Sequence, residues 1–331
     1  MFIIENYTTA VLFCIITMIS WGSSSNTQKL VSSNWRVELF SWDYALGILV
    51  TSIILALTMG SYGVEGRSFF IDIQQAGIES ISSALLGGII FNAANILLIA
   101  AISIAGMSVA FSVGSGLALV IGVIVNFIDL PIGNAVILFS GVGFIVIAIL
   151  LNAITYRRMS HKGGSVSSKG LLISIGSGIL MGLFFKYVAN SIFPDFKMPI
   201  EGKLSPYTAV VIFAIGVFLS NIFFNTLIMY KPFIGTPVAF TDYFKGSFKN
   251  HLLGIIGGSI WCIGMSFSII ASEKAGTAIS YGLASGAIVV ASIWGIYFWK
   301  EFKTAPRGTP ALLNIMLISF FVGLVLIVVS R

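Results

Sequence analysis

The chain has 331 residues, of which 57% are hydrophobic and only 9% are charged. A soluble domain carries roughly 25% charged residues, so this composition excludes an ordinary water-soluble fold. The net charge of +6 could point to a nucleic-acid partner, but the charges cluster between long apolar runs, as is typical of a chain embedded in lipid. We therefore expect an integral membrane protein that binds no nucleic acid.

The apolar runs are long enough to cross a bilayer. A hydrocarbon core about 30 Å thick needs about 20 apolar residues for each crossing helix. Ten such runs predict an all-α, polytopic fold, and in chain order they cover residues 8–28, 43–62, 80–102, 107–128, 132–154, 170–192, 207–230, 250–272, 276–299 and 310–330. Residues 1–7 lack Lys and Arg, and no small-residue cleavage site follows the first run, so we expect helix 1 to be retained.

The loops between the runs differ in positive charge. If the N-terminus is outside, twelve basic residues fall in inside loops, namely Lys29, Arg36, Arg157, Arg158, Lys162, Lys169, Lys231, Lys245, Lys249, Lys300, Lys303 and Arg307. Five fall outside, namely Arg67, Lys197, Lys203, Lys274 and Arg331. The positive-inside rule then predicts that both termini lie outside, in an inner (cytoplasmic) or plasma membrane.

The two halves of the chain resemble each other. A shift of 170 residues aligns helices 3–4 with helices 8–9 without a gap, with Gly87-Gly88 on Gly257-Gly258, Ala105-Gly106 on Ala275-Gly276, Phe111 on Tyr281 and Ser115-Gly116 on Ser285-Gly286. Five helices in each half would insert the second half upside down. We therefore predict a 5+5 inverted repeat, with units 1–156 and 170–331 joined by a basic loop at 157–169; such repeats support alternating access. The alternative is chance similarity between helices rich in small residues.

Polar and aromatic groups inside the runs are candidates for a solute site, because polar groups in the membrane are costly unless satisfied. Asn92 and Asn95 lie three apart on one helix face, and their amides offer donors and acceptors to a neutral solute. The alternative is that they join helices. Aromatic rings could stack on a planar heterocycle or a sugar. The predicted substrate-binding set is Trp21, Asn26, Asn92, Asn95, Phe111, Ser115, Lys186, Trp261, Met265, Tyr281 and Ser285.

Few ionisable groups lie within the runs. Lys186 is the only charge well inside one, where it either snorkels to the interface or faces the cavity and binds an anionic group. Asn221 and Asn225, four residues apart, are expected to be structural. His251 lies near an inside end as a lone histidine, which is more often passive than a proton carrier. No Asp or Glu lies at mid-membrane, so no titrating site is evident.

The sequence contains no recognisable catalytic or metal-binding pattern. Its two cysteines, Cys14 and Cys262, each lie in an apolar run and are expected to pack without forming a disulfide. The two histidines are far apart, and no nucleophile–base pair is visible. We therefore expect neither an enzyme, nor a metal site, nor a cofactor.

Three stretches carry a family resemblance. They are Trp21-Gly22-Ser23 with Asn26 and Lys29; Gly87-Gly88 with Asn92 and Asn95 through Asn126-Phe127-Ile128-Asp129; and His251 with Gly257-Gly258 and Trp261 through Trp294-Gly295 and Trp299-Lys300-Glu301-Phe302. Together they resemble the ten-helix branch of the drug/metabolite transporter superfamily. The nearest likeness is to ureide permeases and their bacterial relatives, with sugar-uptake (glucose/ribose) and L-rhamnose–proton symport families further off. The resemblance implies ion-driven uptake through a cavity lined mainly by helices 1, 3, 4, 6, 8 and 9.

The function expected from these observations is secondary active import of a small neutral polar metabolite, such as a ureide, a nucleobase or a sugar. The partners would be the solute, the lipid bilayer and a coupling proton or sodium ion, and the protein would be a monomer or a weak homodimer. Efflux of drugs or metabolites is the alternative. Helix 1 carries serines and Asn26 but no acid. The positive charge of a drug would therefore have no compensating charge in the low-dielectric interior of the membrane. A channel is also possible, but two similar halves favour a carrier.

Overall fold

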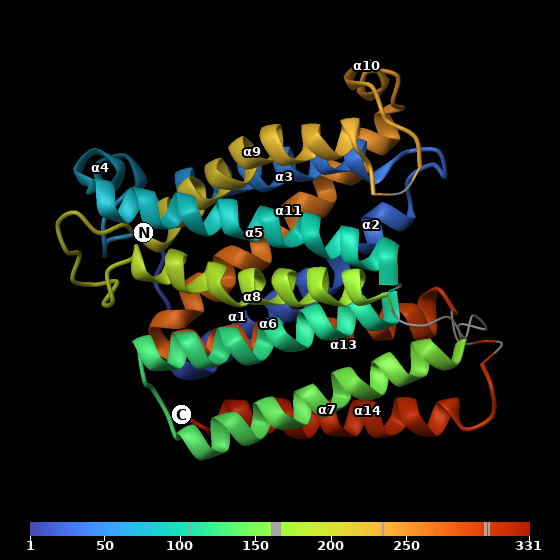
Figure 1. Ribbon diagram of the computed structural model, residues 1–331. Helices are drawn as coiled ribbons and strands as arrows, with labels where there is room; N and C mark the ends of the chain where they lie inside the picture. Colours follow the sequence, from blue (N-terminus) through green and yellow to red (C-terminus); the bar gives the residue numbers. More distant parts are fainter. Residues whose placement is uncertain (106, 160–166, 234, 301–302, 304) are drawn as a thin grey trace.

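The computed structural model describes residues 1–331 apart from 106, 160–166, 234, 301–302 and 304, and apart from the side chains of 107–109, 111 and 159. The part described is a bundle of helices that run roughly along one common direction (Figure 1). Ten of its helical segments are long and apolar enough to cross a membrane. The predicted all-α fold with ten transmembrane helices is therefore confirmed.

The elements in chain order are α1 (Tyr7–Ser24), α2 (Asn26–Lys29), α3 (Val37–Leu57), α4 (Phe69–Gln75), α5 (Ile78–Ala105), α6 (Met107–Asp129), α7 (Ala135–Met159), α8 (Ser168–Asn190), α9 (Pro206–Tyr230), α10 (Phe240–Tyr243), α11 (Phe248–Ala275), α12 (Thr277–Ala284), α13 (Ala287–Ile293), the π-helix η1 (Trp294–Phe298) and α14 (Thr309–Val329). The first membrane span joins α1 to the short α2, and the ninth joins α12, α13 and η1. The ninth is interrupted at Ser285-Gly286, where glycine weakens the helix.

Several helix starts are fixed by capping side chains. Asn6 accepts a hydrogen bond from the backbone N–H of Thr9 at the start of α1. Ser205 does the same for Thr208 at the start of α9, where Pro206 occupies the first helical position without losing a hydrogen bond. Side-chain caps of this kind satisfy backbone donors that would otherwise be left unpaired at a helix end.

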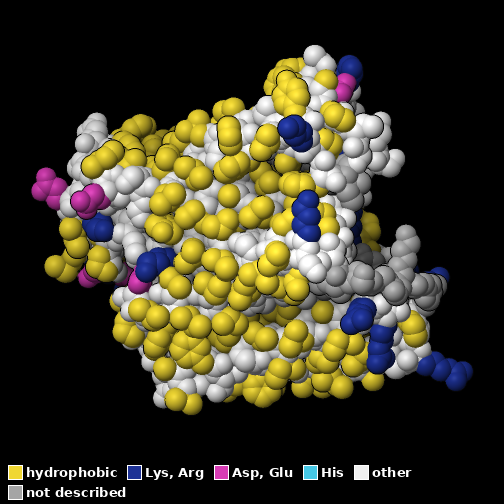
Figure 2. Space-filling model, in the orientation of Figure 1, with side chains coloured by type: hydrophobic (Ala, Val, Ile, Leu, Met, Phe, Trp, Pro, Cys, Tyr) yellow, Lys and Arg dark blue, Asp and Glu magenta, His cyan; other side chains and the backbone are white. Residues whose placement is uncertain are grey.

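Both chain termini lie at one end of the bundle, which we call the terminal face (Figure 1). The opposite end, which we call the basic face, carries the charges of the predicted inside loops, namely Lys29, Arg36, Arg157, Arg158, Lys169, Lys231, Lys245, Lys249, Lys300, Lys303 and Arg307. Figure 2 shows hydrophobic side chains across the middle of the surface and charged ones mostly toward the two ends. This is the distribution expected when lipid surrounds the middle of the bundle.

Glycines set the closest helix approaches. A Cβ atom at Gly88 of α5 would lie 2.1 Å from the carbonyl oxygen of Phe213 in α9. A Cβ atom at Gly258 of α11 would lie 2.0 Å from the carbonyl oxygen of Tyr44 in α3. Only glycine permits backbones to come this close. The two glycines are 170 residues apart in the chain, so α5 meets α9 in the same manner as α11 meets α3.

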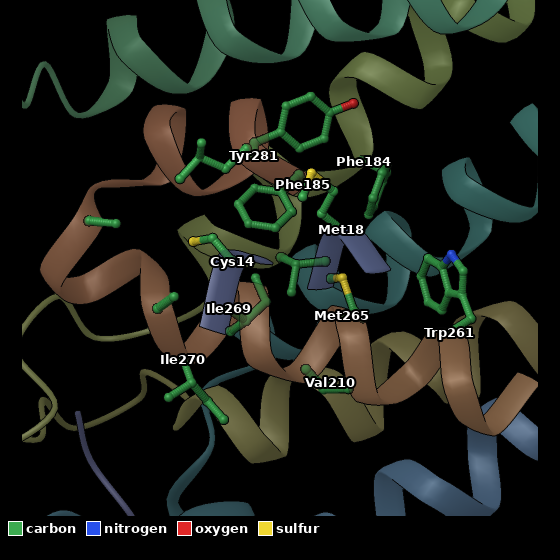
Figure 3. Close-up of a cluster of buried hydrophobic side chains, with 14 of the residues drawn as sticks. Cys14, Met18, Phe184, Phe185, Val210, Trp261, Met265, Ile269, Ile270 and Tyr281 are labelled. Atoms are coloured by element: carbon green, nitrogen blue, oxygen red, sulfur yellow. The ribbon is translucent and has the colours of Figure 1, made fainter. Parts of the chain in front are cut away.

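A packed cluster fills the interior on the terminal-face side of the bundle's centre. Figure 3 shows its members from α1, α8, α9, α11 and α12, with Cys14, Met18, Phe184, Phe185, Val210, Trp261, Met265, Ile269, Ile270 and Tyr281 labelled. Phe185, Met265 and Ile269 are wholly buried. Cys14 and Cys262 are both free and buried. This cluster separates the centre of the bundle from the terminal face.

Candidate functional site

A central cavity of about 190 Å³ lies among α1, α5, α6, α8, α11 and the broken ninth span. Its polar lining residues are Asn95, Ser115, Ser177, Tyr281 and Ser285, and its aromatic ones also include Trp21, Phe91, Phe184 and Trp261. None of the described residues that line it is charged. The cavity is smaller than the 300–1,000 Å³ typical of drug-sized sites, so it suits a small solute.

Two stacked indoles form one wall of the cavity. The rings of Trp21 and Trp261 are 5.5 Å apart between centroids and within 6° of parallel. The Nε1 of Trp21 donates to the carbonyl oxygen of Trp261 at 3.2 Å, which fixes the first ring. Phe91 packs on Trp261 at 4.3 Å, and Gly264 leaves room for Trp21, because a Cβ there would lie 2.7 Å from its ring. The wall therefore offers a fixed aromatic surface.

Most hydroxyl groups at the cavity are already engaged. Ser177 donates to the carbonyl oxygen of Ala94, and Ser285 donates to that of Tyr281. By contrast, Asn95 and Ser115 form no hydrogen bond with any described residue. An amide carries two donor hydrogens and an acceptor oxygen, and a hydroxyl can act as either. These two side chains are thus the uncommitted polar groups of the cavity.

Tyr281 closes the cavity toward the terminal face. Its hydroxyl lies 3.0 Å from the carbonyl oxygen of Met181 in α8 and 3.3 Å from that of Ala118 in α6. Gly122 makes room for its ring, because a Cβ there would lie 2.1 Å from the Tyr281 Cε1 atom. The residue therefore joins α12 to two other helices next to the packed cluster of Figure 3.

A second cavity of about 180 Å³ lies on the basic-face side of the first, among α2, α3, α5 and α9, with Ser25 between α1 and α2 also lining it. Phe91 and Asn95 line both cavities. Asn92 lines only the second, and so does Asn221. Asn221, expected from the sequence to be structural, does bond to α3, and it also lines this cavity. Its four-residue spacing from Asn225 did not reveal that α9 contributes to a cavity.

The structure brings six of the eleven predicted binding residues to the central cavity, namely Trp21, Asn95, Ser115, Trp261, Tyr281 and Ser285. Lys186 instead pairs with Asp129 at 2.8 Å near the terminal face, where both side chains are partly exposed, and it lines neither cavity. Asn26 accepts a hydrogen bond from Trp299 Nε1 at 2.6 Å. Met265 is wholly buried in the packed cluster. The side chain of Phe111 lies outside the described residues.

His251 is not isolated, in contrast to the expectation from sequence. Its Nδ1 lies 2.9 Å from Oδ2 of Asp43, a residue 208 positions away on α3. The Tyr243 hydroxyl donates to Oδ1 of the same carboxylate at 2.5 Å, and the Asp43 side chain is 1% exposed. Burial, and then the hydrogen bond to Asp43, raise the pKa of Tyr243. These three residues tie α3, α10 and α11 together at the basic face.

Comparison with known proteins places this architecture in a family. The sequence matches the ureide permease family over residues 40–165 and 155–330. The chain belongs to the ureide permease family. The resemblance noted in the sequence is thereby confirmed.

Individual relatives cover the whole chain. This ureide permease family member is 23% identical to "Ureide permease 1" of Arabidopsis thaliana, over 100% of this chain and 99% of the relative. It is 22% identical to "Putative sugar uptake protein YxfA" of Lactococcus lactis, over 97% and 98% of the two chains. A solved crystal structure has a similar fold, with a TM-score of 0.60 over 97% of this chain and 98% of that one, at 13% identity. The protein is therefore a multi-pass membrane transporter of small metabolites, and not an enzyme.

Proposed function

We propose that this transporter carries a small, neutral, polar metabolite such as a ureide, a nucleobase or a sugar. The observation that carries the proposal is the Asn95 amide. It lies at the middle of the bundle in a cavity shared with two stacked indoles, and it has no hydrogen bond to a described residue. A polar group left without a partner inside a membrane protein is costly. A solute with matching donors and acceptors would satisfy it.

The absence of charge at the cavity supports a neutral solute. None of the described residues that line either cavity carries a charged side chain. Moving an ionic group out of water requires a compensating charge nearby, and this lining supplies none. Lys186, which could have served an anion, is held by Asp129 outside the cavity. Efflux of lipophilic cations has no carboxylate here to support it.

The arrangement of the cavities supports alternating access. The packed cluster and Tyr281 lie on the terminal-face side of the central cavity, while the second cavity extends from it toward the basic face. The matched glycine contacts at Gly88 and Gly258 are consistent with two five-helix units in opposite orientation. With the basic face inside by the positive-inside rule, this conformation is inward-facing. We also propose that transport of the solute is coupled to a proton or a sodium ion.

The test is uptake of labelled uracil, allantoin and glucose into proteoliposomes that contain the purified protein. Asn95→Ala removes a donor and an acceptor, each of which contributes about 0.5–1.5 kcal/mol net, so we expect a loss of roughly 5- to 150-fold in kcat/KM. Asn152→Ala is the matched control, because Asn152 is a buried amide on α7 that lines neither cavity. Equal transport by Asn95→Ala, Asn152→Ala and the unaltered protein would refute the assignment.

A further inference from the structure

The second cavity differs in chemistry from the central one. Its polar lining consists of Ser25, Gln28, Ser41, Tyr44, Asn92, Asn95 and Asn221. Four of these seven side chains are amides, whereas the central cavity has one amide among its polar groups. The ring of Phe91 stands on the wall between the two. The two cavities are therefore adjacent, share Phe91 and Asn95, and differ in the rest of their lining.

The orientation of the Asn221 amide is fixed by its partner. Its Nδ2 donates to the backbone carbonyl oxygen of Ser41 in α3 at 3.4 Å. A carbonyl oxygen can only accept, so the nitrogen must face α3 and Oδ1 must point to the other side of the amide. No described residue donates to that oxygen. The residue is 2% exposed and lines the cavity, so an acceptor without a donor among the described residues is present at the cavity wall.

Asn92 is fixed in the same way. Its Nδ2 donates to the hydroxyl oxygen of Ser220 at 3.0 Å. The Ser220 hydroxyl in turn donates its hydrogen to the carbonyl oxygen of Val217 at 3.1 Å, so it can only accept from Asn92. The Oδ1 of Asn92 has no donor among the described residues, and the residue is 6% exposed. The cavity thus presents two oriented acceptors, with the free amide of Asn95 beside them.

We propose that this cavity is a second solute-binding site, selective for neutral groups rich in N–H or O–H donors. The Oδ1 atoms of Asn92 and Asn221 accept hydrogen bonds from the solute, and Asn95 contacts it from the boundary with the central cavity. The site deepens the proposed transport function, since the solute held here is the one that passes through the central cavity. Because the second cavity lies on the basic-face side of the central one, the solute binds there as it enters from or leaves toward the basic face.

Asn225 provides a matched control for Asn221. It lies one helical turn further along α9, and its Nδ2 donates to the backbone carbonyl oxygen of Glu38 in α3 at 2.8 Å. Both asparagines therefore join α9 to α3 by the same kind of bond. Asn225 is wholly buried and does not line the cavity. An effect on solute binding that appears only at Asn221 cannot come from loss of the contact between the helices.

The experiment measures protection of a cysteine placed in the second cavity. Gln28 is exposed and lines its mouth, so Gln28→Cys reports access to N-ethylmaleimide. The unaltered protein, whose two cysteines are buried, gives the background. The probes are uracil, allantoin and glucose, which carry N–H or O–H donors, and 1,3-dimethyluracil, which keeps the uracil carbonyls but lacks the N–H donors. Labelling rates are compared with and without each probe.

We expect at least one donor-bearing probe to slow labelling of Gln28→Cys, and 1,3-dimethyluracil to have no effect. Adding Asn221→Ala should raise the half-protecting concentration roughly tenfold, as expected for one lost hydrogen bond to a buried acceptor. Adding Asn225→Ala should leave it within about twofold. Failure of all three probes to protect would overturn the proposal, and so would equal weakening by the two alanine variants.

A third variant separates this site from the central one. Ser115 lines only the central cavity, so Ser115→Leu fills that cavity and leaves the second one intact. Protection that persists in Ser115→Leu while uptake into proteoliposomes is lost supports two sites. Loss of protection in the same variant would mean that Gln28→Cys senses the central site, and the proposal would fail. Failure of the transport function itself appears in the uptake assay, independently of the labelling.

Discussion

Tyr281→Phe should shift the balance between the conformations of the transporter. The phenol has one hydrogen, so its approaches to Met181 and Ala118 at 3.0 and 3.3 Å amount to one shared hydrogen bond. Such a bond contributes about 1 kcal/mol net. If it forms only while the terminal face is closed, its loss raises the population of the terminal-face-open state by about fivefold.

The native Cys14 reports this opening. It is wholly buried in the packed cluster, and its thiol donates to the hydroxyl of Ser280, the neighbour of Tyr281. We expect a membrane-impermeant maleimide to modify Cys14 about fivefold faster in Tyr281→Phe, in proportion to the open population. Mass spectrometry distinguishes modification at Cys14 from modification at Cys262.

Tyr207→Phe is the control for a general loss of stability. Tyr207 is also buried, and its hydroxyl donates to the carbonyl oxygen of Phe2 at 3.1 Å, at the terminal face and away from both cavities. The two variants should lower thermal stability to a similar extent, but only Tyr281→Phe should expose Cys14. Equal rates of Cys14 modification in the two variants would refute the reasoning.

Two further predictions concern the packing that holds the helices. Gly258→Ala places a Cβ 2.0 Å from the Tyr44 carbonyl oxygen, so it should lower the free energy of unfolding by about 1–3 kcal/mol. Gly143→Ala is the control, because a Cβ there meets nothing within 4 Å and should be neutral or slightly stabilising. Equal melting temperatures of the two variants would contradict this prediction. Tyr243→Phe removes a donor to the buried Asp43 carboxylate and should cost about 1.5–3 kcal/mol. The pKa of Tyr243 is raised in the folded protein, so the difference in free energy of unfolding between the variant and the unaltered protein should persist below the ordinary tyrosine pKa of about 10 and shrink as the pH rises above it. A difference in this free energy that shrinks already at neutral pH would contradict the geometry.

The membrane fold could be predicted from sequence because lipid imposes a strong constraint. Each backbone polar group must be satisfied within its own helix, so long apolar runs are nearly sufficient to locate the spans. Some central-cavity residues could also be predicted from the sequence, since Asn95 is a polar residue and Trp261 a large aromatic residue near the middle of their apolar runs. A polar side chain within the membrane is costly unless it is satisfied, so such a residue is a candidate for a binding site.

Other features depend on contacts between distant parts of the chain. Asn92 and Asn95 look equivalent in sequence, yet only Asn92 is bound to another helix, through Ser220. His251 and Asp43 meet across 208 residues, which no local pattern indicates. The role of the Lys186 charge is ambiguous in the sequence because its partner, Asp129, lies 57 positions away. These pairings are set by how the helices pack and not by the pattern along any one of them.

The most direct test of a neutral-solute site at Asn95 is a structure of the protein with a solute bound. Thermal-shift screening of ureides, nucleobases, nucleosides and monosaccharides would select the solute, because a ligand of the folded state raises its stability. We predict that this solute occupies the central cavity, with hydrogen bonds to the Asn95 amide and contact with the indole wall formed by Trp21 and Trp261. A solute seated outside both cavities, or one that leaves the Asn95 amide untouched, would contradict the account.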